Sequence, residues 1–199
     1  LGYKGQIIKD FFLNYKNQTH DFTINLASQK LIYNTNNNLD DWNITFVDTG
    51  LHTMTGGRIS RIRDYVGSED FMLTYGDGIS DIQIDELLSF HHSHNKILTV
   101  TGVHPPGRFG EMVVNKDQRV TEFNEKPQTS QGRISGGFFV ANSKIFNYLN
   151  NDINLVFEDQ PIRKIVSDKQ MMMFKHDGFW QPMDTSREYK LLNNIYSEG

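Results

Sequence analysis

The sequence predicts a single α/β domain whose central sheet is mixed, mostly parallel and flanked by helices. Residues 71–75 form a short apolar run that ends in Gly76-Asp77-Gly78, and a run that does not alternate is typical of a strand buried on both faces. A helical pattern and a second strand at 97–103 follow, which predicts a βαβ unit with a parallel pair. Later, 111–115 and 119–124 predict an antiparallel hairpin.

The remaining elements have their own local signals. Apolar residues at helical spacing predict an amphipathic first helix, Gly67 is a good residue to end a helix, and Ser80 or Asp81 can open one. Pro161 suits a first helical turn. We expect helices at 4–15, 59–66, 80 or 81 to 91, 146–149, 161–166 and 186–196. Besides the strands named above, we expect strands at 21–27, 44–48, 134–141 and 171–175.

Composition narrows the classes of protein and partner. The 20 basic and 24 acidic residues of this 199-residue chain give a net charge of -4, and no basic stripe is present, so nucleic acid and anionic membrane are not expected partners. The absence of cysteine excludes disulfides and thiolate metal sites and fits a reducing cytoplasm. No apolar run approaches the roughly 18 residues of a spanning helix, and no signal peptide is expected.

Two aspartates are the strongest candidates for chemistry. Asp77 follows a predicted strand, where open α/β sheets bind ligands, and the glycines on either side allow close approach of a ligand. Asp184 lies just before the last predicted helix, in Phe179-Trp180-Gln181-Pro182-Met183-Asp184-Thr185. Two carboxylates brought together from distant loops would bind Mg²⁺, with phosphate oxygens and water as further ligands. The alternative for each aspartate is a helix cap.

Three further segments suit phosphate, base or sugar binding. Lys126, restrained by Pro127, could hold a phosphate as a point charge, or it could be a solvated lysine beside a turn. The segment Thr55-Gly56-Gly57-Arg58 could offer free N–H groups to an anion or a base, or be an ordinary glycine turn. The glycine–aromatic loops at 107–110 and 136–139 suit a sugar face, or they mark bulges or tight bends.

Three histidines near the end of a predicted helix invite a metal interpretation. His91, His92 and His94 do not have the four-residue spacing of helical ligand pairs. We interpret them as histidines near a helix C-terminus, where the helix dipole favours positive charge.

Together these segments resemble the sugar-1-phosphate nucleotidyltransferases. The landmarks occur in the family order: Gly2–Gly5, Val47–Gly50, Met54–Arg58, Tyr75–Gly78, Pro105–Gly110, Glu125–Pro127, Gly136–Phe139 and Gly178–Thr185. The most specific are Phe-Trp-Gln-Pro-Met-Asp-Thr and Pro-Pro-Gly-Arg-Phe-Gly, which are similar to the cytidylyl branch that acts on glucose 1-phosphate. The resemblance covers nearly the whole chain, as a single nucleotidyltransferase domain over residues 1–199.

The resemblance implies a Rossmann-like nucleotidyltransferase fold and synthesis of CDP-glucose and pyrophosphate from CTP and α-D-glucose 1-phosphate. Such products are precursors of dideoxy sugars in bacterial surface polysaccharide, including the O-antigen of lipopolysaccharide. In the family's terms each candidate has a role: Asp77 and Asp184 as Mg²⁺ ligands, Lys126 on the sugar phosphate, Glu125 on sugar hydroxyls, Gly110 and Gly137 near the hexose, and Gly57 and Arg58 near the cytosine.

One departure from the family pattern is large. The family begins with a strand and a glycine-rich Gly-Gly-x-Gly-Thr-Arg loop that cradles the triphosphate, and nothing here matches that loop. We expect a chain without it to be unstable and inactive. Two alternatives stay open: a nucleotidyltransferase for another base or sugar, and a catalytically silent module that binds sugar nucleotides. The apolar first helix and the Asn-rich loop at 34–38 are candidate subunit contacts, and we expect a homo-oligomer.

Overall fold

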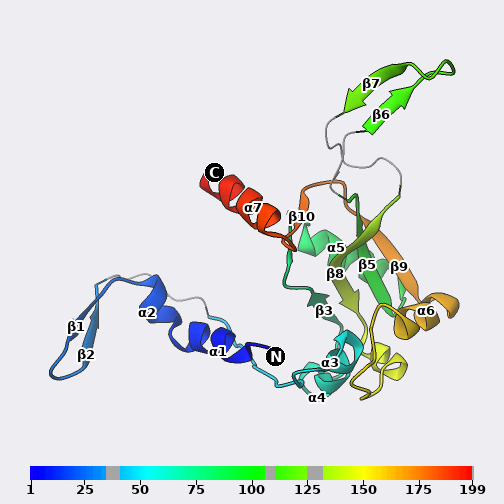
Figure 1. The fold of residues 1–199 in the computed structure, drawn as a ribbon. Helices are drawn as coiled ribbons and strands as arrows, with labels where there is room; N and C mark the ends of the chain where they lie inside the picture. The colour runs from blue at the N-terminus through cyan, green and yellow to red at the C-terminus, as the bar shows by residue number, and fades with distance from the viewer. Residues whose placement is uncertain (35–40, 106–110, 125–131, 199) are drawn as a thin grey trace. The chain divides into compact units, whose positions relative to one another are not determined.

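The computed structural model describes residues 1–34, 41–105, 111–124 and 132–198. The chain divides into two compact units (Figure 1). Unit 1 contains residues 1–64 and 149–158, and unit 2 contains residues 65–148 and 159–199. Among the helices in the described ranges, none has both the length and the apolar character needed to cross a membrane.

The first third of the chain is built mainly of short helices and one hairpin. Its elements are α1 (Gly5–Leu13), α2 (Tyr15–Thr19), β1 (Phe22–Asn25), β2 (Lys30–Tyr33), α3 (Thr55–Arg61) and α4 (Arg63–Val66). The expected first helix and the strand near residue 22 are confirmed. Strand β2, which pairs antiparallel with β1, was not expected from the sequence.

The strand expected at 44–48 is wrong. The structure assigns no strand there, because the segment has no partner strand among the described residues of unit 1. The amino group of Leu1 donates instead to the carbonyl of Val47, and just beyond the segment the amide of Thr49 donates to the carbonyl of Leu1. β propensity alone does not make a strand without a partner.

Unit 2 is organised around a four-stranded mixed sheet. The strands are β3 (Phe71–Thr74), β8 (Ile134–Ala141), β5 (Leu98–Val103) and β9 (Met171–Lys175), and they lie side by side in that order (Figure 1). β3 and β5 both pair antiparallel with β8, and β9 pairs parallel with β5. Three of the four strands therefore run in one direction, as the predicted fold class requires.

Two expectations about the first strand of this sheet need correction. β3 and β5 run in the same direction, but they are not a bonded parallel pair, because β8 lies between them. β3 is also not buried on both faces: Met72 and Thr74 are exposed, and Phe71 and Leu73 are half-buried. The reason is its place at an edge of the described sheet.

Helices and a 3-10 turn cover the sheet of unit 2. α5 (Ile84–His94) packs on β5, β8 and β9, where Leu87 meets Ile82 and Val140 in a buried apolar cluster. The other packing elements are η1 (Ser143–Tyr148) and α6 (Gln160–Ser167), and the ring of Phe146 in η1 stacks on that of Phe71 at 5.7 Å. β5 is buried at all six residues, so it is the centre of the core.

The helix expected from residue 80 or 81 begins later. β4 (Gly78–Ser80) forms an antiparallel pair with β10 (Trp180–Pro182), and this pairing holds the segment extended until α5 starts at Ile84. α7 (Ser186–Glu198) then follows β10. β6 (Glu111–Val114) and β7 (Val120–Asn124) form the expected antiparallel hairpin.

Candidate functional site

The pairing of β4 with β10 brings two distant segments of unit 2 together. Gly78 lies opposite Pro182 in the register, and the amide of Met183 donates a hydrogen bond of 2.7 Å to the carbonyl oxygen of Asp77. Asp77 and Asp184 are the residues just beyond this short ladder. The sequence separates them by more than a hundred positions, and the β4–β10 ladder places them at the same end of the structure.

A cavity of about 180 Å³ joins the two aspartates. It is lined by Tyr75, Asp77, Gly78, Ser135, Gly136, Gly137, Trp180, Pro182 and Asp184. Both aspartates are exposed. Within the described ranges, neither carboxylate has a hydrogen-bond or ion-pair partner. Two uncompensated carboxylates thus face one space that a ligand can enter.

Neither aspartate serves as a helix cap. The helix that follows Asp77 starts at Ile84, and its N-cap residue is Gln83. At α7 the hydroxyl of Thr185 accepts a hydrogen bond from the amide of Glu188, and the carboxylate of Glu188 accepts one from the amide of Thr185. This reciprocal pair is a capping box, so the cap of α7 does not use the Asp184 side chain.

The same Glu188 carboxylate holds the backbone of Asp184. One of its oxygens, Oε2, accepts hydrogen bonds from the amides of Asp184 and Thr185, both at 2.9 Å, and from the Thr185 hydroxyl at 3.0 Å. The main chain that carries the Asp184 carboxylate is therefore fixed from the first turn of α7. Glu188 is not among the site residues predicted from the sequence, although Thr185-x-x-Glu188 has the spacing of a capping box.

Gly136 and Gly137 form the opposite wall of the cavity. Gly137 has φ +79, and a Cβ added there would lie 3.2 Å from the ring of Tyr75, so both conformation and space favour glycine. Its carbonyl accepts a hydrogen bond from the amide of Tyr75 at 3.0 Å. The indole N–H of Trp180, a buried residue, donates to the carbonyl of Gly136 at 2.8 Å. This backbone wall is therefore held from two sides.

Gly57 and Arg58 lie in unit 1, in the first turns of α3. The amides of Gly56 and Gly57 donate to the carbonyl of Leu155, so they are not free N–H groups. The guanidinium of Arg58 donates to the Thr49 hydroxyl at 2.7 Å and to the carbonyls of Leu1 and Leu51. In this structure both residues tie unit 1 together, and their contact with a base stays a prediction.

Three predicted site residues lie outside the described residues: Gly110, Glu125 and Lys126. The structure does not test their roles.

The free carboxylates of Asp77 and Asp184 fit a divalent cation. Mg²⁺ is commonly held by one or two carboxylates, with substrate phosphates and water completing its shell. Over the described ranges, no group of three or more His, Asp or Glu side chains is arranged to hold a metal, and that includes His91, His92 and His94. Substrate phosphates and water would complete the shell of a cation held by Asp77 and Asp184.

Comparison with known proteins assigns the family. The Nucleotidyl transferase family profile matches residues 17–189. Glucose-1-phosphate cytidylyltransferase of Salmonella typhimurium is 39% identical over 199 residues, covering 100% of this chain and 76% of that protein. The probable glucose-1-phosphate cytidylyltransferase of Bacillus subtilis is 38% identical over 199 residues, covering 100% of this chain and 77% of that protein.

Among solved structures, HddC from Yersinia pseudotuberculosis, complexed with GMP-PN, has the same fold. Its TM-score is 0.56 at 18% identity, and the match covers 98% of this chain and 76% of that chain. The α/β fold and the resemblance read from the sequence are both confirmed. The chain belongs to the nucleotidyl transferase family and is similar over its whole length to members named glucose-1-phosphate cytidylyltransferases.

Proposed function

We propose that this protein transfers a cytidylyl group from CTP to α-D-glucose 1-phosphate, giving CDP-glucose and pyrophosphate. The observation that carries the proposal is one cavity lined by both Asp77 and Asp184, in a chain that aligns over its full length with relatives named for this reaction. The family generally uses a divalent metal ion, and we propose that the ion here is Mg²⁺.

The proposed reaction is a single in-line displacement. An oxygen of the sugar phosphate forms a bond to the α-phosphorus of CTP, and the bond from that phosphorus to the bridging oxygen of the β-phosphate breaks. Pyrophosphate leaves with the electron pair of that bond. Because the attacking phosphate is already an oxyanion, the step needs no general base, and catalysis depends on positioning and charge neutralisation.

Asp77 and Asp184 supply carboxylate oxygens for the cation in this proposal. When bound, Mg²⁺ would offset the repulsion between the two reacting phosphates. Gly137, which lines the cavity, would lie near the hexose. Lys126 would hold the incoming phosphate and Glu125 the sugar hydroxyls, with Gly110 near the hexose and Gly57 and Arg58 near the cytosine.

Substitution of the two aspartates tests the site. We expect Asp77→Asn and Asp184→Asn in the full-length protein each to lower kcat at least tenfold, about 1.4 kcal/mol, measured as pyrophosphate release at saturating CTP, glucose 1-phosphate and Mg²⁺. Asp85→Asn, in the first turn of α5, is the matched control and should retain kcat. A loss below tenfold in both site variants would contradict a direct role.

Base and sugar specificity requires a separate assay. Pyrophosphorolysis of CDP-, dTDP-, UDP- and GDP-sugars by the same protein should be fastest with CDP-glucose. Faster turnover of another sugar nucleotide would mean that the proposed base or sugar is wrong and that the reaction is still nucleotidyl transfer. Binding of CDP-glucose without turnover in either direction would instead support a silent binding module.

We also propose that the protein forms a homo-oligomer. α1 has no buried residue, and four of its apolar side chains are exposed: Ile7, Ile8, Phe11 and Leu13. Exposed apolar surface of this kind commonly marks a contact with another molecule.

A further inference from the structure

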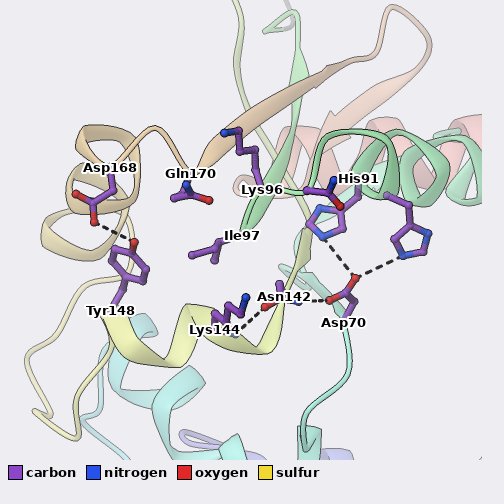
Figure 2. A pocket seen from close by; sticks show the side chains of 11 residues that line it. Asp70, His91, Lys96, Ile97, Asn142, Lys144, Tyr148, Asp168 and Gln170 are labelled. Carbon is purple, nitrogen blue, oxygen red and sulfur yellow. Dashed lines mark hydrogen bonds and ion pairs between the residues drawn. The ribbon is translucent and has the colours of Figure 1, made fainter.

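A second cavity, seen from close by in Figure 2, lies in unit 2 and shares no lining residue with the Asp77–Asp184 cavity. Its volume is about 730 Å³, within the range of small-molecule pockets, and its lining includes Asp70, Ile97, Asn142 and Gln170. Asp70, Ile97 and Gln170 each directly precede a strand, namely β3, β5 and β9, and Asn142 directly follows the antiparallel β8. The cavity therefore opens at the amino ends of the three strands that share a direction, whereas Asp77 follows the carboxyl end of β3.

Both acidic groups in the lining already have partners. One oxygen of Asp70 accepts a hydrogen bond of 2.7 Å from the side-chain amide of Asn142, and its other oxygen lies 3.5 Å from Nε2 of His92 and 3.8 Å from Nε2 of His91. The carboxylate of Asp168 accepts a hydrogen bond of 2.9 Å from the Tyr148 hydroxyl. Figure 2 draws these bonds as dashed lines. Asp70 is thus held on both of its oxygens, and Asp168 on one.

The lining also contains two lysines, Lys96 and Lys144. The amide of Lys96 donates to Nδ1 of His94, and the amide of Lys144 donates to the side-chain oxygen of Asn142, so both backbones are held. Their ammonium groups have no hydrogen-bond or ion-pair partner among the residues that the structure describes. In Figure 2 the side chain of Ile97 lies between them.

The histidine side of the cavity is fixed by packing. His91 is 3% exposed, and its Nδ1 lies 2.8 Å from the hydroxyl of Thr99, a fully buried residue of β5. Asp70, which faces His91 and His92, is in turn held by Asn142. The wall is therefore a preformed polar network, and a ligand would not need to order it.

We propose that this cavity is a second ligand site that takes a small molecule bearing a phosphate group. Lysine binds phosphate as a point charge with three donors, and Lys96 and Lys144 are the two unpartnered cations of the lining. The amide side chains of Asn95 and Gln170, which also line the cavity, can donate to the remaining phosphate oxygens. The site is separate from the Asp77–Asp184 cavity, and the proposal does not depend on the proposed reaction.

The test combines hydrogen exchange with phosphate binding in the full-length protein. Inorganic phosphate, pyrophosphate and glucose 1-phosphate are added separately, in the presence of EDTA so that no turnover occurs. We expect at least one probe to slow exchange in peptides covering residues 91–97 and 142–148. The probe with the highest affinity distinguishes a free phosphate from a phosphate carried by a sugar.

Substitution of the lysines assigns the effect to this cavity. The double variant Lys96→Gln/Lys144→Gln should weaken binding of that probe at least tenfold by equilibrium dialysis and abolish the local protection. Two control variants should retain probe binding and the local protection. Lys96→Arg/Lys144→Arg keeps both charges, and Lys30→Gln/Lys190→Gln changes two exposed lysines elsewhere. Unchanged binding in Lys96→Gln/Lys144→Gln, protection confined to residues 75–80, or no protection by any probe would overturn the proposal. Exchange across the rest of the chain without ligand reports whether each variant is folded.

Discussion

The carboxylate of Glu188 links the cap of α7 to the candidate metal ligand. A helix cap normally satisfies amides of its own first turn, but Oε2 of Glu188 also accepts the amide of Asp184, which precedes the cap. The orientation of the Asp184 backbone thus depends on a residue that does not line the cavity. We infer that Glu188 positions Asp184.

Loss of the Glu188 carboxylate should raise the Mg²⁺ concentration that the enzyme requires. We expect Glu188→Ala to raise the Mg²⁺ concentration for half-maximal rate by about tenfold, or 1.4 kcal/mol, since the Asp184 backbone loses its acceptor. Glu188→Gln keeps an acceptor oxygen and should have a smaller effect. Glu198→Ala, at the other end of α7, is the control. If Glu188→Ala lowers only the unfolding free energy and leaves the Mg²⁺ dependence unchanged, Glu188 is merely a cap.

The indole of Trp180 supports the glycine wall, and a smaller aromatic ring at this position removes its hydrogen bond. Trp180→Phe leaves the carbonyl of Gly136 without its donor in a buried setting, which should cost about 1–3 kcal/mol of unfolding free energy, measured by urea denaturation. Trp42→Phe, at a residue that is 63% exposed, should change stability by less than about 0.5 kcal/mol. Equal effects of the two substitutions would mean that the Trp180–Gly136 bond contributes nothing.

At this scale the sequence identified the two acids, and of their two supports it carries a local signal for Glu188 alone, in the capping-box spacing Thr185-x-x-Glu188. An Asp between two glycines at the end of an apolar run follows from a local rule about strand ends, so Asp77 could be identified. Trp180 and Glu188 act through a carbonyl in β8 and an amide before α7. The bond from Trp180 depends on a long-range pairing, and no local pattern encodes it.

At the scale of elements, the β4–β10 ladder is the clearest difference from expectation. Only three residues pair on each side, and such a short extended segment has no periodicity to detect. Local propensity instead favoured a helix that began at Ser80 or Asp81. Tertiary pairing overrode that propensity, and the same pairing is what places Asp77 beside the segment that carries Asp184.

Two histidines in the last turn of α5 should make the free energy of unfolding depend on pH. Burial lowers the pKa of His91 below its ordinary value of 6.5, although the nearby Asp70 charge acts in the opposite direction. Burial also lowers the pKa of His94. Between the unfolded and folded pKa values, the unfolded chain binds more protons than the folded one. The free energy of unfolding should therefore fall as pH falls below about 6.5 and through the lower folded values.

Replacement of His91 isolates its share of this dependence. We expect His91→Asn, which removes the titrating ring, to flatten the decline in urea midpoint between pH 7.5 and pH 5.5. His52→Asn, at an exposed histidine of unit 1, should leave the slope as it is in the natural protein. A His91→Asn slope equal to the natural one would mean that burial of His91 does not couple folding to protonation.

At the scale of the whole molecule, strand order was the feature least accessible from the sequence. The βαβ pattern correctly implied that β3 and β5 share a direction, but β8, which comes later in the chain, inserts between them. Nothing in residues 71–103 records that insertion. The family resemblance carried the fold class, because its landmarks extend along nearly the whole chain and the profile match covers residues 17–189.

The exposed apolar face of α1 makes the proposed homo-oligomer testable. Ile7 and Phe11 lie one helical turn apart and are 60% and 42% exposed. Ile7→Glu/Phe11→Glu would place two like charges in a subunit contact, because residues four apart share a helix face. We expect this variant to weaken self-association at least tenfold, about 1.4 kcal/mol, in sedimentation experiments across a range of protein concentrations.

A matched substitution separates a subunit contact from general solubility. Leu26→Glu changes an apolar residue that is 78% exposed in the turn between β1 and β2, and it should leave the oligomer intact. If both variants sediment like the natural protein, α1 is not a subunit contact. If the α1 variant becomes monomeric and also loses activity, while Leu26→Glu keeps both properties, assembly through α1 is required for turnover, because Ile7 and Phe11 do not line the Asp77–Asp184 cavity.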